Sequence, residues 1–181
     1  MHLTGQVPES TTPIVVDLHL SATHAATGTL EFNGATADVA RVASTVYIKG
    51  PLSFYAAVGA PAAAIVQLAG NWVQAPIASS ALSSFRSFFA LTDFRQLMAT
   101  VLTPTALPIA KAGTGTVNGT KVVYLTDAKK DKLAISLVGT PYPVAVIPPP
   151  SQQGQLTFSD WNAPVSVTAP AGAINLSTLG G

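Results

Sequence analysis

Residues able to act as metal ligands or nucleophiles are few in this chain. Its three histidines are His2, His19 and His24. His19 and His24 are five residues apart, and no acidic residue stands near them at a spacing that would make it a third ligand. We therefore expect strand or surface histidines and no zinc site. There is no cysteine, which excludes disulfides and thiolate-bound metals.

Serine and carboxylate chemistry has no better support. The Gly-x-Ser-x-Gly elbow does not occur, and Ser79-Ser80 and Ser83-Ser84 lie in a sequence typical of a helix start. The two glutamates, Glu9 and Glu31, are far apart and cannot be assigned as an acid–base pair. We therefore expect no catalytic residue, no metal, no cofactor and no enzyme activity.

One glycine-rich segment superficially resembles a phosphate-binding loop. It runs from Gly113 to Lys121, but its glycine spacing is wrong and a strand pattern follows it. A phosphate loop acts through the N-terminus of a helix, so the context excludes this function. The Asn118-Gly119 pair inside the segment predicts a hairpin turn instead.

The composition points away from nucleic acid and towards apolar contacts. Charged residues make up 9% of the 181 residues, against roughly 25% in an average domain. The net charge is +1 and the only charged cluster, 127–132, is typical of a solvated hairpin tip. Hydrophobic residues reach 48% and the mean hydropathy is +0.41. Either the surface is covered by small residues, as in an exported protein, or part of the apolar surface lines a cavity.

The elements that must position these side chains follow from periodicity. Alternating patterns predict strands at both ends of the chain, with Asn33-Gly34 as a further hairpin turn. The middle changes to a helical period, first from Pro61 to Leu68 and then from Phe94, where Thr92 is the expected N-cap and Pro104 the stop. The expected strands are 2–7, 14–20, 28–32, 36–42, 45–49, 72–74, 109–117, 121–126, 132–138, 142–147, 155–159 and 165–168.

This order predicts an α+β fold in a single domain spanning residues 1–181, with a loose tail at 169–181. About ten strands joined by short links form a large curved antiparallel sheet, a half-barrel, with the helices packed over its concave face. Four phenylalanines of the helical insertion, Phe85, Phe88, Phe89 and Phe94, either pack on the sheet or form a lid that touches a ligand. The residues expected to line a cavity are Val16, Leu18, Leu30, Phe32, Ile48, Phe88, Phe89, Leu97, Leu133, Ile135 and Leu137.

Three short motifs resemble the actinobacterial LppX/LprG-type lipoproteins, whose fold is related to that of the lipoprotein carrier LolA. They are Val46-Tyr47-Ile48-Lys49-Gly50, Gly70-Asn71-Trp72-Val73, and the segment 155–167 with its Trp161-Asn162-Ala163-Pro164-Val165 end. The resemblance implies a half-barrel with an apolar cavity that binds acylated lipids or glycolipids. Family precursors carry a signal peptide and a lipidated cysteine, whereas here Met1 is followed directly by a strand pattern.

We therefore predict non-catalytic binding and transport of a lipid or acylated glycolipid in an exported protein of the cell envelope. The protein would act at the outer face of the cytoplasmic membrane or in a periplasm-like space, with a peripheral membrane contact and no nucleic acid partner. The alternative is an envelope interaction or chaperone module of the same fold without a lipid cargo. The apolar run 56–73 contains Gly59, Pro61 and Gln67, so we expect buried helix and strand there and no membrane span.

Overall fold

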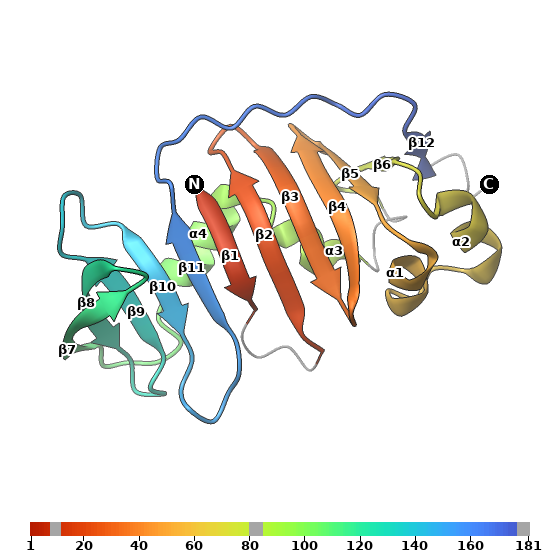
Figure 1. Ribbon diagram of the computed structural model, residues 1–181. Helices are drawn as coiled ribbons and strands as arrows, with labels where there is room; N and C mark the ends of the chain where they lie inside the picture. Colours follow the sequence, from red (N-terminus) through yellow and green to blue (C-terminus); the bar gives the residue numbers. More distant parts are fainter. Residues whose placement is uncertain (8–11, 80–84, 177–181) are drawn as a thin grey trace.

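The computed structural model describes residues 1–7, 12–79 and 85–176. Within them, one open sheet has the strand order β12-β6-β5-β4-β3-β2-β1-β11-β10-β9-β8-β7 (Figure 1). The expected α+β fold with a large antiparallel sheet is confirmed, although the sheet does not close. The strands are β1 (His2–Gln6), β2 (Ile14–Leu20), β3 (Ala25–Phe32), β4 (Ala35–Val42), β5 (Thr45–Lys49), β6 (Val73–Pro76), β7 (Ala110–Val117), β8 (Thr120–Thr126), β9 (Lys132–Ser136), β10 (Pro143–Ile147), β11 (Gln155–Ser159) and β12 (Ile174–Asn175).

Both predicted Asn-Gly turns are confirmed. Asn33 and Gly34 have φ angles of 51° and 76° between β3 and β4, and Asn118 and Gly119 have 47° and 80° between β7 and β8. Positive φ at both central positions matches the twist of the two joined strands, which is why these sequences form tight hairpins. The turns fix the register of both strand pairs.

Long-range pairing joins the two halves of the sheet at β1, which lies between β2 and β11. After β11 the chain runs along the ends of the strands to the opposite edge, where β12 pairs with β6 in parallel (Figure 1). Two sequence predictions were wrong here. Residues 165–168 were expected to form a strand and do not. The segment 169–181 was expected to be a loose tail, but it includes β12; residues 177–181 of that segment lie outside the described part of the chain.

The sheet ends at β7 on its other side. The register between β7 and β8 shifts between Lys111 and Thr114, and Gly113 between them has a φ of 93°. Most residues of β7 are exposed. The edge strand is therefore irregular and solvated along most of its length.

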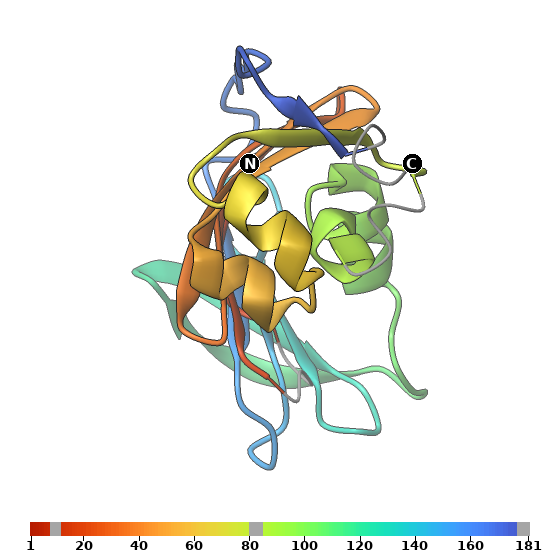
Figure 2. The ribbon, with the colours of Figure 1, turned by 90° about the vertical axis from the view of Figure 1, so that its right-hand side faces the viewer.

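The helices cover one face of the sheet (Figure 2). They are α1 (Leu52–Ala57), α2 (Ala62–Leu68), α3 (Arg86–Ala90) and α4 (Phe94–Leu102). The N-cap of α4 is Asp93 and not Thr92, as the sequence predicted, because Thr92 is buried and its hydroxyl donates to the carbonyl of Phe89. Among the described residues, no helix has the length and apolar character that crossing a membrane requires.

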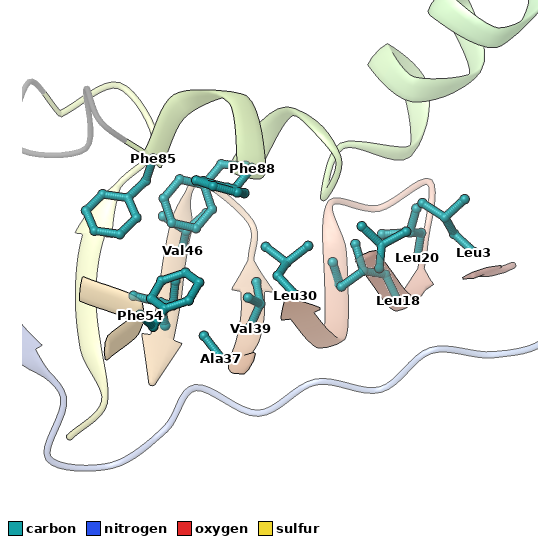
Figure 3. Packing of buried hydrophobic residues seen from close by; sticks show 14 of the residues in the cluster. Leu3, Leu18, Leu20, Leu30, Ala37, Val39, Val46, Phe54, Phe85 and Phe88 are labelled. Atoms are coloured by element: carbon teal, nitrogen blue, oxygen red, sulfur yellow. The ribbon is translucent and has the colours of Figure 1, made fainter. Parts of the chain in front are cut away.

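The main core fills the space between the helices and strands β1–β6 and β11 (Figure 3). Phe85, Phe88 and Phe89 are each at most 5% exposed, and Phe88 packs against Phe32 and Phe54 at ring distances of 5.2 and 6.2 Å. Phe88 meets Phe32 edge to face and Phe54 at a tilted angle, which are the arrangements that aromatic rings prefer in a protein core. The packing interpretation therefore holds for these three phenylalanines.

A second, smaller cluster lies on the C-terminal strands. It consists of Val117, Val122, Ala134, Val144 and Ala145. Because successive side chains of a strand point to opposite faces, Leu133 points away from the cluster that contains Ala134. The face that Leu133 occupies is the one on which the helices lie, and it carries the candidate site.

Candidate ligand pocket

An open pocket of about 350 Å³ lies between α4, the chain that follows it, and strands β8–β11. This volume is at the low end of the roughly 300–1,000 Å³ typical of small-molecule pockets. The lining is mostly apolar, with a few polar side chains. Its residues are Val7, Leu91, Leu97, Thr100, Val101, Leu102, Thr103, Pro104, Thr105, Ile109, Leu125, Thr126, Asp127, Asp131, Lys132, Leu133, Val146, Pro148, Gln152 and Leu156.

Strand register builds the apolar floor of this pocket. Leu125 pairs with Leu133, Leu133 with Val146, and Val146 with Leu156. Directly paired residues point to the same face of a sheet, so the four side chains form one continuous row. On α4, Leu97 and Val101 are four residues apart, which places both on the helix face that forms the opposite wall.

The end of α4 and the chain after it present apolar side chains to solvent beside the pocket. Leu102, Leu107 and Ile109 are 58%, 74% and 49% exposed. Leu102 and Ile109 also line the pocket. Apolar surface therefore continues from the pocket interior to the outside of the molecule.

Asp127 holds the 103–109 segment against the β8–β9 hairpin. Its Oδ2 accepts hydrogen bonds from Thr105 Oγ1 at 2.6 Å and from the amide of Ala106, and its Oδ1 accepts from the amides of Lys129 and Asp131. The hydrogen bond from Thr105 stabilises the charged carboxylate and so lowers the pKa of Asp127. Desolvation acts in the opposite direction, but the hydrogen bonds from the backbone amides lower the pKa further. The predicted hairpin tip is correct, but its first residue is a structural anchor and not a solvated one.

Replacing Asp127 with asparagine should lower the melting temperature at neutral pH and have no such effect in strong acid. A depressed carboxyl pKa contributes stability above the unfolded value of about 3.8, and that contribution disappears as pH falls through the folded value. Thermal unfolding of both proteins between pH 7 and pH 2.5 measures the difference. A difference in melting temperature that stays constant across this pH range would contradict the conclusion that the charged carboxylate of Asp127 stabilises the fold.

A buried ion pair anchors the other end of α4. Arg41 of β4 is 5% exposed, and its Nη1 lies 3.1 Å from Oδ2 of Asp93, the N-cap residue. Burial alone would raise the pKa of Asp93, but the amide of Gln96 and the Arg41 guanidinium outweigh it, so the pKa is lowered. His24 Nδ1 lies 3.6 Å from the same carboxylate. The position of α4 therefore depends on charges that the sheet supplies.

The structure brings only two of the eleven expected cavity residues into the pocket, Leu97 and Leu133. Ile135 is half-buried and Leu137 is 55% exposed. The others belong to the main core or pack against it, where the helices already fill the concave face: Val16, Leu18, Leu30, Phe32, Ile48, Phe88 and Phe89.

Sequence reasoning missed the residues after α4 and the row on β8–β11. The only signal was the concentration of large apolar residues at the end of the helix and just after it, namely Val101, Leu102, Leu107 and Ile109. Of the residues considered for catalysis, Glu9, Ser80, Ser83 and Ser84 lie outside the described part of the chain.

No family model matches this chain. Its sequence also matches no curated protein. The resemblance to LppX/LprG-type lipoproteins therefore stays a prediction, and any functional proposal has to rest on the pocket.

Proposed function

We propose that this protein binds a lipid by enclosing one acyl chain in the pocket between α4 and β8–β11. The observation that supports this is an open, mostly apolar pocket whose lining includes the exposed Leu102 and Ile109, with the exposed Leu107 in the same segment of chain. Each methylene moved from water to such a lining contributes about 0.8 kcal/mol. The pocket volume of about 350 Å³ favours one chain over two.

The proposed cargo is an acylated lipid or glycolipid of a cell envelope, and the protein would carry it without chemical change. Thr105, Asp127 and Asp131 line the pocket and give it a polar side. A headgroup that donates hydrogen bonds would face this side while the acyl chain lies on the leucine and valine row. The exposed apolar segment beside the mouth would contact the membrane surface from which the lipid is taken.

The test is lipid capture by a pocket-blocking variant. Val101→Trp places an indole in the pocket wall on α4, whereas Val66→Trp adds the same group at a position that is 76% exposed on α2. If the indole displaces only two methylenes of the acyl chain from the pocket, the lipid loses about 1.6 kcal/mol of binding free energy, which weakens its affinity more than tenfold. Native mass spectrometry after incubation with envelope lipids should therefore show a lipid-sized extra mass on the wild type and on Val66→Trp, and little on Val101→Trp.

A module of the same fold without cargo is the second candidate, and one observation favours it. The concave face over β1–β6 is filled by buried side chains, including Phe54, Phe85 and Phe88 (Figure 3). A wild-type protein that stays at its apo mass would support this alternative. Equal lipid uptake by both tryptophan variants would likewise overturn the assignment of the pocket.

A further inference from the structure

Two histidines and an aspartate meet on the sheet face that the helices leave open. His2 of β1 pairs directly with His19 of β2, and Asp17 precedes His19 by two residues on the same strand. The alternating burial of β2 directs Val16, Leu18 and Leu20 to the core, so Asp17 and His19 point the other way. The sequence predicted no acidic third ligand for His19 and His24. For His19 this was wrong, because Asp17 lies on the same face of β2 and contacts His2 across the strand pair.

Backbone pairing brings the two imidazoles close together. Met1 and Leu20 exchange both backbone hydrogen bonds, so the next pair, His2 and His19, is a non-hydrogen-bonded pair, in which side chains approach most closely. The rings are stacked with centroids 4.2 Å apart and an interplanar angle of 7°. Nε2 of His2 lies 2.7 Å from Oδ1 of Asp17.

We propose that His2, Asp17 and His19 form a binding site for a divalent transition metal such as Zn²⁺. Their ligand atoms all lie within 4.8 Å of one another. In a tetrahedral zinc site with bonds of about 2.0–2.1 Å, neighbouring ligand atoms are about 3.3 Å apart. Asp17 and His19 are exposed and His2 is half-buried. Because the lone pair of an imidazole nitrogen lies in the ring plane, the two rings must rotate out of their parallel stack to bind one ion, and solvent fills the fourth position. Two imidazoles with one carboxylate suit zinc and exclude a preference for Ca²⁺ or Mg²⁺.

Asp160 provides the outer partner that a metal-bound histidine needs. It follows β11, whose last residue, Ser159, pairs with His2. Asp160 Oδ2 lies 3.7 Å from Nδ1 of His2, the ring nitrogen that does not face Asp17. When Nε2 binds the metal, Nδ1 carries the proton. The 3.7 Å separation is longer than a hydrogen bond, so Asp160 has to move closer to accept this proton's hydrogen bond, fix the tautomer and strengthen the ligand. The site therefore joins β11, β1 and β2, the strands where the two halves of the sheet meet.

Titration of the full chain with Zn²⁺, followed by calorimetry, tests the site. The wild type should take up one metal per chain. The double variant His2→Gln/His19→Gln should bind at least about 100-fold more weakly, and Asp160→Asn about tenfold more weakly, because it keeps all three ligands. His24→Asn is the matched control, since His24 lies elsewhere, 3.6 Å from Asp93. Its affinity should equal that of the wild type.

Co²⁺ gives a second readout, because tetrahedral coordination produces strong visible absorption that the double variant should lack. Thermal unfolding with a chelator present should show that the double variant folds like the wild type, so that lost binding reports lost ligands. The proposal is overturned if the wild type binds no Zn²⁺. It is equally overturned if the double variant binds Zn²⁺ as tightly as the wild type.

Discussion

Gly28→Ala is expected to leave little folded protein. Gly28 pairs with Leu18 of β2, and its φ of 146° is a conformation that side-chain-bearing residues rarely adopt. An added Cβ would lie 1.9 Å from the carbonyl oxygen of Asp17 and 2.9 Å from the Cα of Leu18. Both are backbone atoms, so no side-chain rotation relieves the overlap. We expect a loss of more than about 4 kcal/mol, a large part of the 5–15 kcal/mol that stabilises a typical domain.

Gly34→Ala is the matched control for this prediction. Gly34 also has a positive φ, 76°, but an added Cβ would meet no atom within 4 Å. The cost there should be the left-handed backbone alone, about 1–2 kcal/mol. Urea unfolding of both variants measures the two losses. Equal losses of stability in the two variants would contradict the prediction, because they would show that the close approach of β2 and β3 does not require a glycine at position 28.

Arg41→Met should be the next most damaging change, with an expected loss of about 3–5 kcal/mol. It removes the buried cation and leaves the Asp93 carboxylate, 18% exposed in its side chain, facing an apolar group. It also removes the hydrogen bond from Nε of Arg41 to the carbonyl of Ala43. Because Asp93 caps α4, and α4 forms a wall of the pocket, the variant should lose stability and proposed lipid uptake together.

A double variant separates the ion pair from simple loss of packing. Asparagine keeps the N-cap function, so adding Asp93→Asn to Arg41→Met removes the unpaired charge and should restore part of the lost stability. Arg95→Met is the control for losing an arginine, since Arg95 is exposed and its Nε contacts the carbonyl of Ala22 at 3.5 Å, a long hydrogen bond. Its cost should stay within about 0.5 kcal/mol. No recovery in the double variant would contradict the ion-pair explanation.

Local signals in the sequence predicted much of this fold. Asn33-Gly34 and Asn118-Gly119 determine hairpins through their own backbone preferences, and alternation on 14–20 reports which side of β2 is buried. The pairing of β1 with β11 could not be predicted this way, because it joins residues about 150 positions apart, such as Leu3 and Phe158. The parallel pairing of β12 depends equally on the path of the whole chain along the sheet.

Most of the residues expected to line a cavity lie outside the pocket for a packing reason. The expected residues lay on β2, β3 and β5, on the helical insertion, and at 133–137, and of these Leu97 and Leu133 line the pocket. Over β2–β5, alternation identified the inward-facing residues but did not show what covers them. Phe54 and Tyr55 of α1, a helix the sequence did not predict, are fully buried over that region and, with Phe88, occupy the space. Over β8–β11, where α4 ends and no further helix of the described chain follows, Leu125, Leu133 and Val146 of the apolar row stay only partly buried.

The irregular end of the sheet at β7 has a consequence for how these molecules behave beside one another. A straight edge strand offers free amide and carbonyl groups on which a second molecule can add a strand, and sheets then grow into aggregates. At β7 the register shift at Gly113 bends that row, and exposed Lys111 places a charge on it. At the opposite edge β12 is only two residues long, too short to seed an intermolecular ladder. Both ends thus discourage fibre-like growth in a protein with few charges to keep its copies apart.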